Sequence, residues 1–495
     1  MPCDTTFTGS QEPITCGWYN MGLIRWIKET FGKMFLRKEA KDVFGIDLSA
    51  NSKMDALINQ WYNITSGNPP WIDADDDIDS INFAQYIDDV TSGLVTLDIG
   101  INLPDSARGK ELQKVANYLM EKIDEKVSDA LGSAGIMFKP NGEKLDYYYP
   151  GSFIPTDWDS NGNILGCIFV NRKYVEKKIY TKFEYHRYEN LGEQRLYAIS
   201  NRSFKSTSEN SKGDPCKLTE VAEWAELMPD AYIENVDIPL FAYYGNPKPN
   251  FLEKGSALKL PIWEICRKEL RDLDIAWSRK STEVEDSKHI TFVPQQAIMY
   301  AEQHNIKLPR FLKGLQINAG TTEGKVDEHV STLLTEQRIK DINSILAMIS
   351  TKLGYDQGFF VLDEKTGMMT ATQVEADDQS TIRTIKNLRD PLRDTIIKLL
   401  YGANVFIDIY HDEIPAEAWG RSYEEMKKAL ADAFSFGDIT YSYEEDKQSW
   451  WKYRIQGDVP PWMYYVKFEG MSEEEARAMV EEAQPKEPTL FGGEE

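Results

Sequence analysis

One short acidic motif has the residue types of a calcium-binding loop. Asp157-Trp-Asp159-Ser-Asn161-Gly162 matches the first half of an EF-hand, in which oxygen ligands alternate along the chain before a glycine turn. The twelfth position of that loop would be Ile168, where calcium needs a bidentate glutamate. Residues 147–153 and 164–170 on either side have strand-like patterns. We therefore expect a β-hairpin tip in which Asn161-Gly162 supplies positive φ angles, and weak calcium binding at this surface stays open.

The other motifs that carry enzyme chemistry are missing from the sequence. It has no Walker A loop, no GxGxxG after a strand, no HExxH and no GxSxG. A carboxylate pair could act as in a glycosidase, but among 80 acidic residues no pair stands out. The five histidines are scattered, which argues against a histidine metal site: His186, His289, His304, His329 and His411. We expect no catalytic residue, no metal and no cofactor.

Composition and charge limit the possible partners. The 495 residues are 41% hydrophobic, enough to bury a core, and their formal net charge of −24 would repel DNA phosphates. No apolar run of about 18 residues exists, so no membrane span is expected. Five widely spaced cysteines favour free thiols in a reducing compartment: Cys3, Cys16, Cys167, Cys216 and Cys266.

The N-terminal residues 1–39 are predicted to form an extension or arm. The first twenty residues lack the basic start and apolar stretch of a signal peptide. Met21 opens a basic amphipathic segment and could itself be the translation start in place of Met1. That segment fits packing against a neighbouring subunit or the chain's own body, and docking on a membrane surface is the alternative.

Hydrophobic periodicity divides the rest into helical, strand-rich and again helical regions. Residues 40–145 have mostly helical patterns, and 145–241 alternate as strands, most clearly at 179–188 and 195–200. Residues 239–254 are expected to be a loop. Amphipathic helices are then predicted at 261–286, 334–353 and 373–400, with a small mixed element at 289–330 that opens with a strand. The tryptophans near 61–71 and 450–462 are interpreted as core or interface residues rather than stacking platforms.

The segment before the third long helix combines several signals. A strand-like piece at 358–363 turns at 365–367, and Thr372 is expected to cap the helix with Glu375 in a capping box. Glu375, Asp377 and Asp378 lie at the positive end of the helix dipole. Pro391 is expected to kink the helix. A second capping box is predicted at Ser472–Glu475, and the tail 483–495 has a disordered composition.

These pieces, in this order, resemble the portal proteins of tailed bacteriophages that infect Gram-positive bacteria. The resemblance covers roughly residues 21–482. Thr370-Ala-Thr-Gln-Val374 is the best match, with Gln373 where the family usually has glutamate. The other pieces are Trp61-Tyr62, Gly67-Asn-Pro-Pro-Trp71, Ser152-Phe-Ile-Pro-Thr-Asp-Trp-Asp-Ser-Asn-Gly162, Pro239-Leu-Phe-Ala-Tyr-Tyr244, Gly255-Ser-Ala257, Leu273-Asp-Ile-Ala276, Ile290-Thr-Phe-Val-Pro294 and Gly358-Phe-Phe-Val-Leu-Asp363.

The resemblance implies an α+β, portal-type fold. Its parts would be a wing at 40–254 (helical, then β-rich), stem helices at 255–287 and 333–353, a small α/β clip at 288–332, a tunnel loop at 354–372, a long kinked helix and return at 373–410, and a helical crown at 411–482. Clip residues for docking of the motor and adaptor would include His289, Phe292, Pro294, Tyr300 and Phe311. The DNA-facing tunnel loop would include Asp356, Gln357, Asp363, Glu364, Lys365, Thr366, Met368 and Met369. The start of the helix that supports this loop would include Thr370, Thr372, Gln373, Glu375, Asp377 and Asp378.

The implied function is structural. Such chains form a homo-oligomeric ring, usually of twelve, at one capsid vertex, and double-stranded DNA passes through its channel during packaging and ejection without being read by sequence. The implied partners are the terminase large subunit, the major capsid and scaffolding proteins and the head-completion adaptor. Assembly would take place in the host bacterial cytoplasm, and the ring would end in the virion. Two other readings are another phage head or adaptor protein without a channel, and an acidic carbohydrate-active enzyme.

Overall fold

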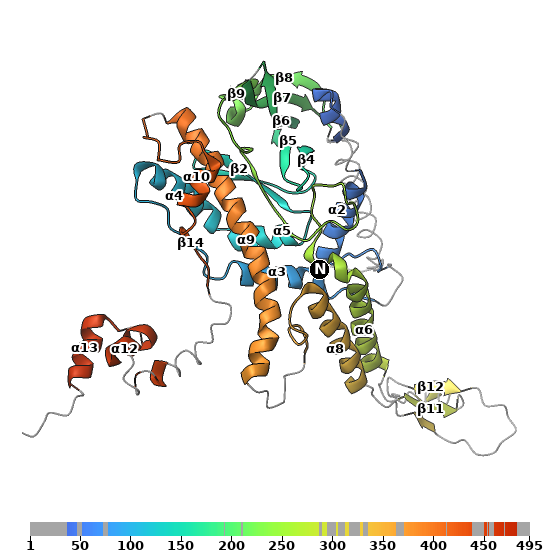
Figure 1. Ribbon diagram of the computed structural model, residues 1–495. Helices are drawn as coiled ribbons and strands as arrows, with labels where there is room; N and C mark the ends of the chain where they lie inside the picture. The colour runs from blue at the N-terminus through green and yellow to red at the C-terminus, as the bar shows by residue number, and fades with distance from the viewer. Residues whose placement is uncertain are drawn as a thin grey trace, which may run out of the picture. The chain divides into compact units, whose positions relative to one another are not determined.

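The chain is an α+β protein whose computed structural model divides into two compact units between Phe436 and Gly437. Figure 1 shows the helices and strands of both units. The structure describes residues 37–46, 52–72, 78–192, 194–208, 211–286, 290–294, 303–304, 312–315, 327–329, 335–362, 371–411, 413–437, 450–452, 454, 460–469 and 471–482.

Helices open the described part of the first unit, as predicted for the mostly helical region 40–145. A helix at 37–44 is followed by α2 (Ser52–Thr65), α3 (Phe83–Val95), α4 (Ala107–Met120) and α5 (Ile123–Leu131). Ser106 caps α4, because its hydroxyl accepts the backbone N–H of Gly109 at 2.9 Å. Each helix buries one apolar face, with Trp61, Ile87, Leu112 and Val127 almost fully covered.

A three-stranded antiparallel sheet follows, where helix and loop had been predicted. Its order is β10-β2-β3, with β2 at Ile136–Asn141, β3 at Lys144–Tyr148 and β10 at Ala242–Tyr244. The helical reading of residues 136–145 was therefore wrong, and the loop reading of 239–254 missed β10. Short strands of this kind carry little periodic signal, and β10 pairs with a strand about a hundred positions earlier.

The second sheet is larger and antiparallel. Its order is β4-β5-β6-β7-β8, with β9 also paired to β7. A core of Ile154, Ile168, Val170, Phe183 and Phe204 lies on one face, and the helix at 37–44 packs on it through Ala40. The strands are β4 (Phe153–Trp158), β5 (Ile164–Val175), β6 (Lys178–Leu191), β7 (Gln194–Ser206), β8 (Asp214–Cys216) and β9 (Asp230–Ile233).

The acidic motif lies at the β4–β5 hairpin tip, as predicted. The Asp159 carboxylate accepts the backbone N–H groups of Asn161 and Asn163 at 2.8 Å, which are turn bonds. Gly162 has a φ of +81°, whereas Asn161 is not among the positive-φ residues. The first strand of the hairpin is β4 (Phe153–Trp158), so the strand predicted at 147–153 was placed too early in the sequence.

Two long helices follow the sheets. A short 3₁₀ turn, η4 (Ile262–Cys266), leads into α6 (Arg267–Asp286), and α8 spans Thr335–Leu353, close to the predicted bounds. Between them in sequence lies a small sheet of order β12-β11-β13, in which β11 pairs in parallel with β12 and antiparallel with β13. Its strands are Ile290–Pro294 (β11), Leu312–Leu315 (β12) and Asp327–His329 (β13). The predicted opening strand of this element is thus confirmed.

A 40-residue helix, α9 (Ala371–Tyr410), is the longest element of the first unit. It packs against α3, α4, β2 and β10, and its buried face includes Ile385, Leu388, Leu392, Ile396 and Leu399. The helix continues ten residues beyond the predicted end at 400. α10 (Tyr423–Ala429) then packs on α9, and β14 (Phe434–Ser435) returns to pair with β1 (Gly100–Ile101).

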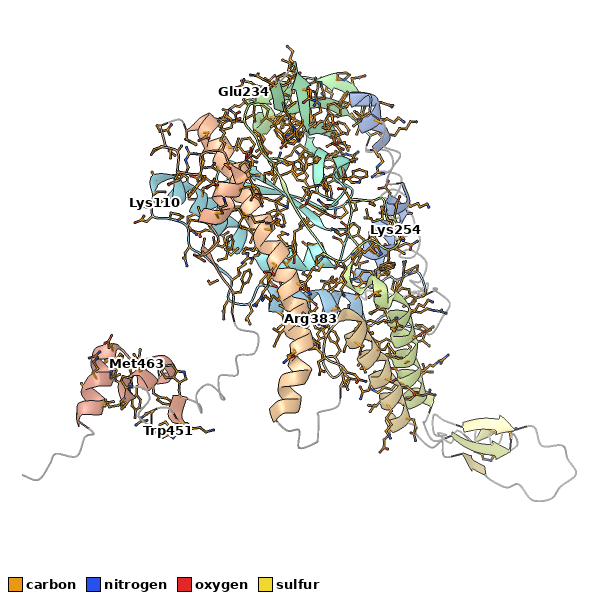
Figure 2. The ribbon with its side chains drawn as sticks, viewed as in Figure 1. Lys110, Glu234, Lys254, Arg383, Trp451 and Met463 are labelled. Carbon is orange, nitrogen blue, oxygen red and sulfur yellow. The ribbon has the colours of Figure 1, made fainter. Side chains whose placement is uncertain are left out.

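The second unit is helical where the structure describes it. Its labelled helices are α12 (Pro461–Glu469) and α13 (Glu473–Glu482), which pack on each other. The predicted capping box is confirmed, because the Glu475 carboxylate accepts the Ser472 N–H at 3.2 Å and Ser472 Oγ accepts the Glu475 N–H at 3.3 Å. Trp451 and Met463 are exposed on this unit (Figure 2).

Candidate functional site

The α6/α8 helical pair is the centre of the candidate site. Cys266 and Ile349 meet at the base of the pair, where the Cys266 thiol lies 3.9 Å from the Ile349 carbonyl. Lys352 Nζ donates to the Glu269 carboxylate at 2.6 Å across the two helices. Leu270, Leu273, Ile342 and Leu346 are buried on the facing sides. The pair is therefore a packed antiparallel hairpin (Figure 1).

Three tryptophan–carboxylate bonds tie this hairpin to the first helices. Each joins an indole N–H to a carboxylate 175 to 203 positions away in the chain. Because the partners are so distant, they could not be identified from the sequence. The bonds are Trp61 to Glu264 at 2.8 Å, Trp71 to Asp274 at 2.9 Å and Trp263 to Asp88 at 3.0 Å. Trp61 is fully buried, which agrees with its interpretation as a core residue.

These carboxyl groups are also electrostatically unusual. Burial raises the pKa of Glu264 and of Asp274, and it raises the pKa of Asp88 well above its ordinary value. In each case the indole hydrogen bond opposes the shift without cancelling it. The three carboxyl groups therefore link distant segments of the first unit through their indole partners.

The segment 354–362 joins α8 to α9 and is hydrogen-bonded to both. Thr384 of α9 donates its hydroxyl to the Gly354 carbonyl at 2.6 Å, and the Asp356 N–H donates to Thr381 Oγ1 at 3.0 Å. On the α8 side, the Leu362 N–H donates to Asn343 Oδ1 at 3.1 Å. We call residues 354–362 the junction.

Aromatic rings pack the junction against α3. Tyr355 stacks on Phe359 with centroids 4.7 Å apart, and its hydroxyl lies 2.6 Å from the Thr91 hydroxyl of α3. Phe360 meets Phe83 of α3 edge-on at 5.4 Å. The junction is thus a fixed corner between two long helices rather than a strand. The predicted strand at 358–363 is wrong over its described residues, since 357–360 form turns.

The structure describes only some of the predicted tunnel-loop residues and of the residues at the start of the following helix. Asp356 and Gln357 lie in the junction, and Gln357 is exposed. α9 begins at Ala371, so Thr372 lies inside the helix and is not its N-cap, a correction to the predicted boundary. Gln373, Glu375, Asp377 and Asp378 lie in the first two turns of α9. Outside the described residues lie Asp363, Glu364, Lys365, Thr366, Met368, Met369 and Thr370.

Pro391 lies inside α9, as expected. Proline has no N–H to donate to the carbonyl four residues earlier, which here belongs to Asn387. The neighbouring Leu388 carbonyl accepts the Tyr244 hydroxyl at 3.2 Å, and the Pro391 carbonyl accepts the Thr395 hydroxyl at 2.8 Å. A helical stripe that runs up to and just past Pro391 is exposed and polar or charged (Figure 2 labels Arg383): Gln379, Arg383, Lys386, Asp390 and Arg393.

Two of the predicted clip residues lie in the small sheet. Phe292 and Pro294 belong to β11, the strand shared by both pairings. His289, Tyr300 and Phe311 lie outside the described residues.

A buried charged cluster that the sequence did not reveal joins β6 of the six-stranded sheet to β2 of the three-stranded sheet. Lys139 Nζ and Lys182 Nζ each lie 2.7 Å from the Glu184 carboxylate, whose other neighbour is His186 Nε2 at 2.8 Å. Burial alone would raise the pKa of Glu184, but the two ammonium groups hold it well below its ordinary value. Burial lowers the pKa of Lys182 and of His186. None of these four residues lines either of the two cavities described below.

Two cavities in the described part of the chain lie beside α8. One, of about 360 Å³, lies where the end of α8 meets α9 and is lined by Lys248, Leu353, Tyr355 and Leu388, among others. The other, of about 330 Å³, lies along the α6/α8 hairpin. The described residues hold no group of three or more metal-ligating side chains, and no described helix is long and apolar enough to cross a membrane.

The sequence matches no protein-family profile, and no curated protein is significantly similar to it.

Proposed function

We propose that this chain is the subunit of a phage portal: a homo-oligomeric ring, of twelve chains as is usual in that family, at one capsid vertex. Its channel would pass double-stranded DNA during packaging and ejection without reading the sequence. The chain would have no catalytic role, and the terminase large subunit would supply the ATPase. It would assemble in the host bacterial cytoplasm with the major capsid and scaffolding proteins, and a head-completion adaptor would bind it in the virion.

One observation carries the proposal, namely the order of elements after the six-stranded sheet. A helical hairpin, α6 and α8, has a small mixed sheet between its helices in sequence, and a fixed junction then leads into a 40-residue helix with an internal proline. This order corresponds to the stem, clip, tunnel-loop and kinked-helix order that the motifs implied. The crown was predicted at 411–482, but in this proposal residues 411–436 would belong with the first unit. The reason is that α10 packs on α9 and β14 pairs with β1.

The experiment is to measure the mass of the purified chain in solution and to image the same sample by negative-stain electron microscopy. Twelve chains of 56.8 kDa would give a particle of about 680 kDa, and a closed ring would show a central hole. Rings with a hole support the proposal. Closed particles without a hole would favour a head or adaptor protein that has no channel, and a monomer that hydrolyses a polysaccharide would overturn the portal proposal.

A further inference from the structure

A groove with an apolar floor and charged rims runs along the α6/α8 hairpin. We call it the hairpin groove. Its floor is formed by Ile275, Ala276 and Ile345, and the cavity measures about 330 Å³. Met348 lies one helical turn beyond Ile345 on the same face of α8 and is 51% exposed. The rims carry two carboxylates and two guanidinium groups: Asp272, Asp341, Arg279 and Arg338.

A second apolar surface lies at the junction, and we call it the junction patch. Tyr86 of α3 and Leu362 are its most exposed members, at 53% and 54%. The Tyr86 ring lies 6.1 Å from the Phe360 ring, and Leu362 follows Phe360 by two residues in the chain. Phe359 lies against Phe360 at 4.8 Å and is half-buried. The patch therefore consists of an exposed aromatic ring and an exposed aliphatic side chain beside a packed aromatic base.

The two surfaces lie on opposite sides of α8. The junction contacts α8 through Asn343 and Ser350, whose side chains bond the Leu362 and Phe360 N–H groups. The groove side of α8 carries Ile345, two positions after Asn343, and Met348, two positions before Ser350. Two positions along an α-helix turn a side chain by about 200°. One helix therefore separates an apolar recess from an apolar projection.

We infer that the junction patch of one copy inserts into the hairpin groove of the next copy. A recess and a projection on opposite sides of one element make a head-to-tail contact, which repeats from copy to copy and closes into a ring if the rotation allows. Exposed apolar surface bordered by charge is typical of such interfaces. The inference rests on the proposed ring and names the surfaces that build it.

The test uses substitutions at the two most exposed positions, where the fold tolerates a charge. Met348→Asp blocks the groove and leaves the patch intact, whereas Leu362→Asp blocks the patch and leaves the groove intact. Met228→Asp is the matched control, because Met228 is 68% exposed and lies outside both surfaces. We expect each of the first two variants to lose the assembled mass seen for the wild type and the control to retain it.

Mixing the variants tests the head-to-tail geometry. Met348→Asp still offers a patch and Leu362→Asp still offers a groove, so the two together can form one intact contact. We expect their mutual affinity, measured by analytical ultracentrifugation, to be at least tenfold tighter than the self-association of either. The double variant, which keeps neither surface, should bind neither partner.

The outcomes separate this inference from the proposed function. Rings that form equally well with Met348→Asp or Leu362→Asp would overturn the inference and leave the portal proposal standing. Open chains or filaments that both substitutions abolish would support the contact and argue against a closed portal. Self-association of the wild type with no gain on mixing would overturn the head-to-tail assignment.

Discussion

At the scale of residues, the buried cluster around Glu184 is held by a defined chain of donors. The Leu240 N–H donates to the Tyr197 hydroxyl oxygen at 3.1 Å, which leaves the Tyr197 O–H to donate to His186 Nδ1 at 2.9 Å. The proton of the neutral imidazole is then on Nε2, where it bonds the Glu184 carboxylate. Both lysines donate to this carboxylate, and the Asp146 carboxylate, 3.6 Å from Lys139 Nζ, supplies the second negative charge.

Glu184→Gln should be strongly destabilising at pH 7. It removes the negative charge that compensates two buried lysines, and breaking a buried pair from one side costs about 3–5 kcal/mol. Because the folded pKa of Glu184 is lowered, its contribution is complete above the ordinary value of 4.5 and is lost as the pH falls through the folded pKa. Urea unfolding at pH 7 and pH 4 checks this, since the gap between wild type and variant should narrow at pH 4.

The control for this prediction is Glu220→Gln, which breaks an exposed ion pair with Lys205. Exposed pairs contribute little, so its unfolding curve should overlay that of the wild type. Equal stability of Glu184→Gln and wild type at pH 7 would mean that the cluster does not hold a charged carboxylate.

Asp88 predicts the opposite pH dependence. Its folded pKa is raised by burial, so the folded state holds its proton more tightly than the unfolded state. Stability is then lost as the pH rises from about 3.8 through the folded pKa. Asp88→Asn keeps an acceptor for the Trp263 indole and removes the charge. At pH 8 it should be more stable than wild type by at least about 1.4 kcal/mol, the equivalent of one pKa unit.

The advantage of Asp88→Asn should shrink as the pH falls and disappear below the ordinary pKa of 3.8, where Asp88 is protonated in both the folded and the unfolded wild type. Thermal unfolding from about pH 3 to pH 8 measures this change. Asp105→Asn, at an exposed carboxylate paired with Lys110, should show no such trend. A constant difference between Asp88→Asn and wild type at all pH values would show that Asp88 does not titrate in this range.

At the scale of elements, the junction depends on one glycine. Gly354 has a φ of +92°, a left-handed conformation that disfavours other residues, and an added Cβ would lie 2.7 Å from Thr384 Oγ1. That hydroxyl is the group that bonds the Gly354 carbonyl. Gly354→Ala should therefore cost about 1–2 kcal/mol and release the end of α8 from α9.

Hydrogen exchange at the Asp356 and Phe360 amides measures this release, because both donate to side chains of the flanking helices. Gly93→Ala is the matched control: Gly93 lies within α3 and nothing is within 4 Å of its added Cβ. That change should be neutral or stabilising by up to about 1 kcal/mol. Unchanged exchange in Gly354→Ala would show that the corner is held without this turn.

The elements that sequence predicted best are those with long periodic patterns. α6 and α8 were found near their true ends because one apolar seam runs along each. α9 was predicted to end at 400, and its last ten residues are held by distant groups. Arg108 of α4 bonds Asp408 and Asn404, and Tyr401 donates to the Arg421 carbonyl. Contacts of this kind leave no local periodicity to detect.

The candidate site was predicted in outline and missed in its detail. The order of hairpin, small sheet and long helix came from periodicity and motifs. The junction did not, because its conformation depends on hydroxyl and aromatic contacts with α3, α8 and α9. The alternation at 179–188 was interpreted as a half-exposed strand, yet β6 is buried on both faces from Ile179 to Glu184. Lys182 and Glu184 carry charged side chains, and their burial is tolerable because they pair with each other and Glu184 also binds Lys139 of β2.

At the scale of the whole molecule, net charge opposes self-association. Each chain carries a formal charge of −24, so neighbouring copies repel at low ionic strength. The inferred contact is apolar at its centre, and the two carboxylates and two guanidinium groups on the groove rims balance in formal charge. Salt screens the repulsion between chains over a Debye length of about 30 Å at 0.01 M and about 8 Å at 0.15 M, and it leaves apolar burial intact.

The assembled fraction should therefore rise as sodium chloride increases from 10 to 150 mM, roughly, at constant protein concentration. Mass photometry or sedimentation velocity across that series measures the fraction directly. Met228→Asp adds one negative charge away from both surfaces and should need slightly more salt to assemble, which serves as an internal calibration of the repulsion. Assembly that falls with added salt would mean that ion pairs, such as those available to Arg279 and Asp341 on the groove rims, dominate the contact instead of its apolar floor.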